Sequence, residues 1–156
     1  MLKKYLIFIT LVIIFFISKS LALENKILIK VDNEIVTTVD IFEEIDYLNA
    51  VNRNIQKLQK NKIFEIAKNS LIKKKIKEKE INKYMKDVEI DQSYIDQIIV
   101  ANASKLGFKS VKDFNNHLSN FNLSIDSLKP RILNEILWNE LVVEKYSNKL
   151  VIDEKK

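Results

Sequence analysis

His117 is the only histidine of the 156-residue sequence, and the chain has no cysteine. A metal site needs several Cys, His or carboxylate ligands at suitable spacing, and acid–base catalysis needs an imidazole with a positioned partner. His117 lies on a predicted short helix without such neighbours, so we interpret it as a surface histidine. Without cysteine there is no thiol nucleophile, disulfide framework or Cys-based metal site.

Three acidic residues, Glu43, Glu44 and Asp46, gather on one predicted helix. Paired carboxylates can act as general acid and base where their surroundings separate their pKa values. On an amphipathic helix such residues usually form the solvated face, and this is our interpretation. The sequence also lacks a P-loop, a Gly-rich dinucleotide turn, a nucleophile elbow and a zinc motif. We therefore expect no enzymatic activity, no metal and no cofactor.

Large apolar and aromatic side chains are better candidates for a functional role than the polar residues above, because they can form a binding surface. Trp138 is expected at the flank of an apolar stripe, because successive helical residues are about 100° apart. An aromatic residue at such a flank can line a groove. The alternative is that these side chains only complete the core. The candidate binding residues are Tyr84, Met85, Phe108, Trp138, Val142 and Tyr146.

The first 22 residues combine a basic start, an apolar run from Tyr5 to Ile17, and small residues at Ser20 and Ala22. This pattern is typical of a cleavable secretory signal peptide. The alternative is a retained membrane anchor, but a span needs about 20 apolar residues and this run is shorter. We expect export across the inner membrane to the periplasm, with signal peptide 1–22 removed and one domain over 23–156.

Positive charge is not concentrated in the expected mature chain. The whole sequence has 26 Lys and Arg against 21 Asp and Glu, a net charge of +5. Loss of Lys3, Lys4 and Lys19 with the signal leaves 23 against 21, a net charge of +2. Nucleic-acid binding depends on clustered positive charge. We therefore expect no nucleic-acid partner.

One Gly and one Pro in a chain with 47% hydrophobic residues favour a single, mainly helical domain. The exception is residues 27–36, where alternating apolar residues flank a polar turn and predict a β-hairpin. The tail residues Val151 and Ile152 are a possible third strand, which would tie down both chain ends. The predicted fold is a bundle of about five helices with a small N-terminal hairpin.

The helices are bounded by capping and stop signals. Thr37 or Thr38 caps the first helix, which spans 39–51 and buries Ile41, Phe42, Ile45 and Leu48. Residues 52–62 form a loop or continue this helix. The second helix runs from about residue 63 to Tyr84 or Met85, with a buried stripe of Ile63, Phe64, Ala67, Leu71, Ile72 and Ile76.

The later helices begin at Asp91 and Ser110, and the former ends at Gly107 in a Schellman-type stop with Phe108 folding back. The last helix reaches about Tyr146 and begins after Ser124 or Ser127. Pro130 favours Ser127, because the proline then falls in the first turn, where no intrahelical donor is lost.

The order of these signals resembles the N-terminal domain of SurA-type periplasmic chaperones. The hairpin and helix start match at Val31, Asp32, Ile35, Val36, Thr37 or Thr38, and Asp40. The end of the second helix matches at Val88, Ile90 and Asp91, and the short-helix unit at Gly107, Phe108, Ser110, Asp113, Phe114 and Leu118. The likeness covers Leu23 to Ile152, and its specificity lies in the order of the pieces.

The resemblance implies a chaperone that binds unfolded outer-membrane proteins without ATP, through an apolar and partly aromatic surface. The parvulin isomerase domain of the family is absent, so we expect no prolyl isomerase activity. The segment that completes the family's N-terminal core after the isomerase domains is also absent. We expect the resulting bare apolar surface to take a second copy, another protein or a client peptide. The alternative function is an adaptor that binds one fixed partner through this surface.

Overall fold

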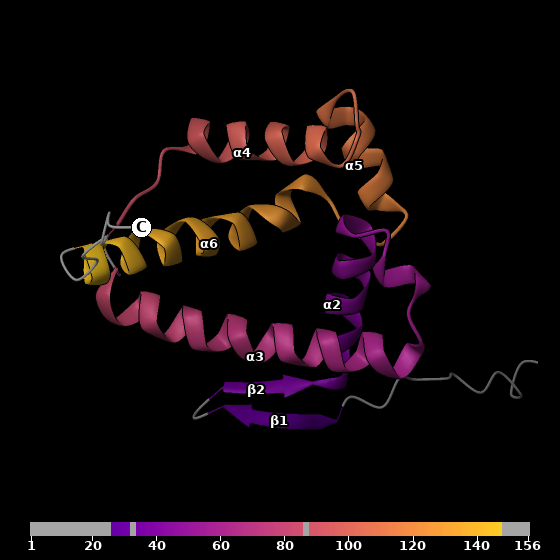
Figure 1. Cartoon of the computed structure of the whole chain (residues 1–156), viewed down its shortest axis with the longest axis horizontal. Coiled ribbons are helices and arrows are strands. Elements are labelled where there is room, and N and C mark those ends of the chain that lie inside the picture. The colour runs from indigo at the N-terminus through magenta and orange to yellow at the C-terminus, as the bar shows by residue number, and fades with distance from the viewer. Residues whose placement is uncertain (1–25, 32–33, 86–87, 148–156) are drawn as a thin grey trace, which may run out of the picture.

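The structure, a computed structural model, describes residues 26–31, 34–85 and 88–147, and is mainly helical (Figure 1). Strands β1 (Ile27–Val31) and β2 (Glu34–Thr37) form an antiparallel hairpin. The helices are α2 (Thr38–Val51), the short 3₁₀ helix η1 (Ile55–Lys57), α3 (Lys60–Tyr84), α4 (Gln92–Lys105), α5 (Val111–Ser119) and α6 (Ile125–Tyr146). The predicted fold class is confirmed. Val151 and Ile152 lie outside the described residues, which contain no third strand.

The elements are arranged as layers closed at one end (Figure 1). The hairpin lies along α3, α6 runs between α3 and α4, and α2 stands across the end of these helices. The short helix α5 turns the chain from α4 back into α6. Among the described residues, no helix combines the length and the apolar character that a membrane span needs.

The hairpin is stabilised by its packing against α2 and α3. Ile29 pairs with Val36, and Val36 is completely buried in a cluster with Ile41, Ala67 and Leu71. Lys75 on α3 reaches Glu34 on β2, with 3.0 Å between the ammonium nitrogen and a carboxylate oxygen. Because a two-stranded hairpin alone is marginal in water, this packing on α2 and α3 is what stabilises it.

The starts of α2, α4 and α5 and the end of α4 are fixed by the predicted caps. Thr37 accepts from the Asp40 N–H while the Asp40 carboxylate accepts from the Thr37 N–H, a reciprocal capping box. Asp91 and Ser110 cap α4 and α5. Gly107 adopts φ +87°, and the paired bonds from Gly107 N–H to Ser104 O and from Phe108 N–H to Ala103 O make the Schellman stop.

The start of α6 differs from the prediction. Ser124 caps the helix, not Ser127, so Pro130 lies inside α6. Two side chains explain the earlier start: the Ser124 hydroxyl accepts from the Ser127 N–H, and the Asn115 amide oxygen accepts from the Ile125 N–H. These bonds satisfy exposed amides of the first turn. The Asp126 carbonyl in turn loses its intrahelical donor, because Pro130 has no N–H.

Two side chains assigned to buried stripes are exposed. Phe42 is 44% and Ile76 48% exposed. Phe42 lies off the face of α2 that carries Ile41. Ile76 falls between the two regions where α3 is packed, around Leu71 against the hairpin and α2, and around Ile81 against α6. For residues 52–62 the sequence left open a loop or a continued helix. Residues 52–59 form a loop that contains η1, and α3 begins at Lys60.

The core of the described residues is divided into four small clusters. One lies under the hairpin, one at the α4–α5 corner, one between α4 and α6, and one where α3 and α6 end. Their buried members include Val36 and Leu71, Phe114 and Leu118, Ile99 and Ile136, and Ile81 and Leu141. Helices that meet only through such separate contacts leave space between them.

Candidate binding cleft

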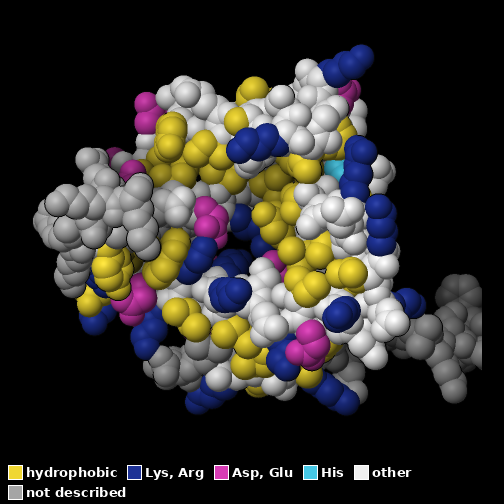
Figure 2. All heavy atoms as spheres, in the orientation of Figure 1, with side chains coloured by type: hydrophobic (Ala, Val, Ile, Leu, Met, Phe, Trp, Pro, Cys, Tyr) yellow, Lys and Arg dark blue, Asp and Glu magenta, His cyan; other side chains and the backbone are white. Residues whose placement is uncertain are grey.

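A cleft of about 770 Å³ lies between α2, α3, α4 and α6, and we call it the central cleft. Figure 2 shows it as a hollow near the centre of this face, with hydrophobic and basic side chains on its walls. Its volume falls in the range of ligand-binding pockets, about 300–1,000 Å³. Its lining is mainly apolar on the α4 side and mainly charged on the α3 side.

The apolar wall comes mostly from α4 and the facing part of α6. Ile98, Leu106 and Ile132 are half-buried and line the cleft, and Tyr94 is 49% exposed at the start of α4. The buried portions of Ile98, Leu106 and Ile132 belong to the clusters at the α4–α5 corner and between α4 and α6. Their exposed portions leave a strip of apolar surface in contact with solvent.

The base of the cleft holds a buried ion pair that the residue pattern did not predict. Glu44 is 1% exposed, and one of its carboxylate oxygens accepts a bond of 2.6 Å from Arg131 Nη1. The other accepts from the Ser70 hydroxyl at 2.7 Å. The Arg131 guanidinium also lies 4.1 Å from the centre of the Tyr47 ring. Our interpretation of Glu44 as part of a solvated face is therefore wrong: it joins α2, α3 and α6.

Tyr47 shares the surroundings of this pair. Burial raises the pKa of its hydroxyl above 10.0, since the phenolate is poorly solvated there. Arg131 acts in the opposite direction and lowers that pKa, while Glu44 raises it further. The tyrosine is therefore neutral at physiological pH, and its ring is a fixed apolar surface beside Arg131.

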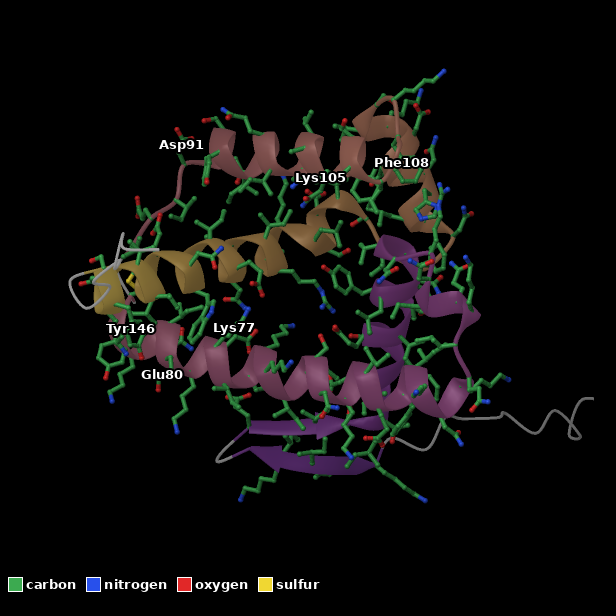
Figure 3. All side chains as sticks on the ribbon, in the orientation of Figure 1. Lys77, Glu80, Asp91, Lys105, Phe108 and Tyr146 are labelled. Atoms are coloured by element: carbon green, nitrogen blue, oxygen red, sulfur yellow. The ribbon has the colours of Figure 1, made fainter. Side chains whose placement is uncertain are left out.

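Lysines form the charged side of the cleft. Lys77 on α3 binds both carboxylate oxygens of Glu135 on α6 at 2.7 Å. Lys74 lies 3.8 Å from Glu78. Lys73 on α3 and Lys105 at the end of α4 make no hydrogen bond or ion pair within the described residues. Figure 3 shows Lys77 and Lys105 on helices from opposite sides of the cleft.

His117 has a structural role. Its ring is half-buried, not fully on the surface, with Nε2 2.9 Å from the Ala50 carbonyl oxygen. The ring lies between Phe108 and Phe121, at centroid distances of 4.9 and 5.2 Å. No cluster of His, Cys, Asp and Glu that could hold a metal ion occurs in the described part of the chain.

The six candidate binding residues lie outside the central cleft. Met85 is buried, and Trp138 packs on the cluster that contains Met85 and Leu141. Val142 is half-buried on the same part of α6. Phe108 packs at the α4–α5 corner, and Figure 3 shows it at the opposite end of the molecule from Tyr146. The six residues therefore do not form one surface.

Two of the six, Tyr84 and Tyr146, are about half exposed where α3 and α6 end. The Lys145 ammonium lies 3.5 Å from the centre of the Tyr84 ring and 3.4 Å from a Glu80 carboxylate oxygen. A hydrogen bond with Lys83 lowers the pKa of the Tyr84 hydroxyl below 10.0, and the charges of Lys145 and Lys83 lower it further. This end of the molecule is amphipathic, with basic groups beside aromatic rings.

The residues of the cleft gave only a weak signal in the sequence. Glu44 occurs three residues after Ile41 and four before Leu48, so helical spacing places it on the buried face. Lys73 and Lys77 share a face of α3 for the same reason. No local pattern, however, predicts that α4 is held away from α3, because that separation depends on the packing of α6 between them.

The comparisons with known proteins yield no family model, no curated protein and no solved structure that matches this chain. The resemblance to SurA-type chaperones accordingly remains based on the residue pattern alone.

Proposed function

We propose that the protein is an ATP-independent periplasmic chaperone or client-binding domain, which holds unfolded outer-membrane proteins in the central cleft. The observation that carries the proposal is the cleft itself, about 770 Å³ in volume, with an apolar strip on α4 and α6. An extended chain segment binds such a surface by burying alternate apolar side chains, which releases about 25 cal/mol per Å² of apolar area.

The divided core also supports this function. A holding chaperone must accept unrelated sequences, and this requires walls that adjust to different side chains. α4 is fixed to α6 mainly through one of its faces, where Ile95 and Ile99 pack against Ile136 of α6. Small movements of α4 relative to α3 would change the width of the cleft without opening the cluster that Val36 and Leu71 form under the hairpin.

The N-terminal segment supports the proposed compartment. Residues 1–22 have the basic start, short apolar run and small residues of a secretory signal peptide. Clients that cross the periplasm unfolded need protection from aggregation there. We include a second copy of the chain as a competing occupant of the cleft, because homo-oligomers commonly bury apolar surface.

The test is suppression of aggregation. An unfolded outer-membrane β-barrel protein is diluted from urea with and without an equimolar amount of this protein, in the absence of nucleotide, while light scattering is recorded. We expect the protein to reduce the scattering. Scattering that is unchanged at several molar ratios would overturn the proposal.

Matched variants on one helix locate the binding surface. Ile98→Asn places an amide in the cleft wall, and Val100→Asn makes the same change in polarity at a side chain that is 54% exposed and outside the cleft. We expect Ile98→Asn to weaken the suppression and Val100→Asn to leave it unchanged, with thermal melts confirming that both variants are folded. Recovery of one stoichiometric partner from the periplasm, with no effect on aggregation, would favour the adaptor function instead.

A further inference from the structure

Some charged side chains that line the central cleft form ion pairs, and others do not. Its lining contains five basic side chains and three acidic ones: Lys73, Lys74, Lys77, Lys105 and Arg131, and Glu44, Glu135 and Glu140. Glu44 is paired with Arg131, and Glu135 with Lys77. Lys74 lies near Glu78, outside the lining. After these pairs, Lys73, Lys105 and Glu140 remain.

The remaining charges are separated along the cleft. Glu140 follows Arg131 by nine residues on α6, which corresponds to about 13 Å along the helix axis. Lys73 is one turn of α3 from Ser70, and Ser70 binds the same carboxylate as Arg131. Lys105 is the last residue of α4, at the end nearest α5 (Figure 3). We call the part of the lining formed by Lys73, Lys105 and Arg131 the cationic end.

Hydrogen-bond donors at the cationic end remain available to a ligand. Arg131 Nη1 donates to Glu44, and the plane of its guanidinium lies against the Tyr47 ring, so further N–H groups of the guanidinium are left for a ligand. Glu44 and Tyr47 hold it in one orientation, so little side-chain entropy is lost when it binds a ligand. Lys73 and Lys105 are exposed and carry no partner within the described residues. The apolar strip of Ile98, Leu106 and Ile132 lines the same cleft.

We propose that the central cleft selects extended segments in which an Asp or Glu side chain stands among apolar residues, with the carboxylate attracted by the positive charge that Lys73, Lys105 and Arg131 add to the lining. This inference rests on the proposed function, and it adds the chemical class of the client segment. Charge complementarity favours an acidic side chain, because its single negative charge is attracted by Lys73 and Lys105, whereas both lysines repel a basic side chain. Burial of the neighbouring apolar residues supplies the affinity, and the carboxylate supplies the preference.

The experiment uses three fluorescein-labelled peptides of about ten residues, about 33 Å when extended. All three carry the same apolar side chains and a C-terminal amide, and differ only in two internal positions, which are Glu, Gln or Lys. Binding to the full chain is measured by fluorescence anisotropy. We expect the Glu peptide to bind about five-fold more tightly than the Gln peptide, and the Lys peptide more weakly than both.

Two double variants test the residues. Lys73→Gln with Lys105→Gln removes the unpaired charges and should bring the Glu-to-Gln affinity ratio to about one. Lys62→Gln with Lys112→Gln makes the same change in net charge at exposed positions outside the cleft, and should leave the ratio at about five. Raising the salt concentration from about 0.1 M to about 1 M shortens the Debye length from about 10 to 3 Å and should also reduce the ratio.

The outcomes separate the two proposals. Equal binding of the Glu and Gln peptides would overturn the selection of acidic segments while the client-binding function stands. A ratio that falls equally in both double variants would show that net charge, not the cationic end, causes the preference, and would also overturn the inference. Binding of none of the three peptides would overturn both proposals.

Discussion

Glu44 illustrates how a single residue can join three helices. Its carboxylate binds Arg131 on α6 and Ser70 on α3 from a buried position on α2. A buried carboxylate without a cation is costly, because neither water nor a counter-charge compensates its desolvation. The pair therefore makes the position of α6 on α2 specific, beyond what apolar contacts would do.

The first prediction concerns this pair. Arg131→Met leaves Glu44 buried without a counter-charge, and we expect it to lower the free energy of unfolding by about 2–4 kcal/mol in urea denaturation. Glu44→Leu combined with Arg131→Met replaces both charges by apolar groups and should recover most of the loss. A double variant that is less stable than Arg131→Met would contradict this explanation.

The second prediction concerns two tyrosines. Tyr84 should ionise below pH 10.0 because of Lys83 and Lys145, and Tyr47 above pH 10.0 because it is buried. The stability that Tyr84 contributes is therefore present above pH 10.0 and lost as the pH falls through its lowered pKa. The contribution of Tyr47 is present below pH 10.0 and lost as the pH rises through its raised pKa.

The pKa values of Tyr84 and Tyr47 are measured from the absorbance of the phenolate as the pH is raised. Difference titrations against Tyr84→Phe and Tyr47→Phe isolate the two groups, and Lys83→Gln should raise the pKa of Tyr84 towards 10.0. A common midpoint for the two tyrosines would contradict the assignment.

At the scale of elements, α6 contains a clear conflict between sequence preference and structure. Pro130 is exposed inside the helix, where it leaves the Asp126 carbonyl without an intrahelical donor. The third prediction is that Pro130→Ala raises the free energy of unfolding by about 1–2 kcal/mol, because the new N–H can bond to Asp126. Urea denaturation measures the change. A less stable Pro130→Ala protein would contradict this explanation.

Elements were predictable where local chemistry decides them. The Thr37 and Ser110 caps and the Gly107 stop each depend on residues within one or two turns, and all three are confirmed. The start of α6 was predicted wrongly because Asn115, ten residues before Ile125, supplies a cap that no local rule anticipates. The candidate site was harder to predict than the helix ends, because only tertiary packing brings Lys73 of α3 and Lys105 of α4 to the same cleft.

At the scale of the whole molecule, the division of the core predicts uneven stability. α3 packs against the hairpin, α2 and α6, whereas α4 is held mainly by α6 and α5. The fourth prediction is that backbone amides in the middle of α4 exchange with solvent faster than those in the middle of α3, because local opening follows the amount of packing. Hydrogen exchange followed by mass spectrometry measures this.

Addition of the Glu peptide should slow the exchange of α4 more than that of the hairpin, because the bound segment contacts α4. Equal protection of α3 and α4 in the free protein, with no change when the peptide is added, would contradict the view of α4 as the adjustable wall.

Lys73 and Lys105 belong to none of the four packed clusters. Substitutions at sites without shared partners combine almost additively, and exposed positions rarely affect folding by more than about 0.5 kcal/mol. The charge pattern of the cleft can therefore drift over evolutionary time while the scaffold stays intact. If the proposed function holds, diverged descendants of one ancestral chain would differ in the polypeptide segments that they bind long before they differ in fold.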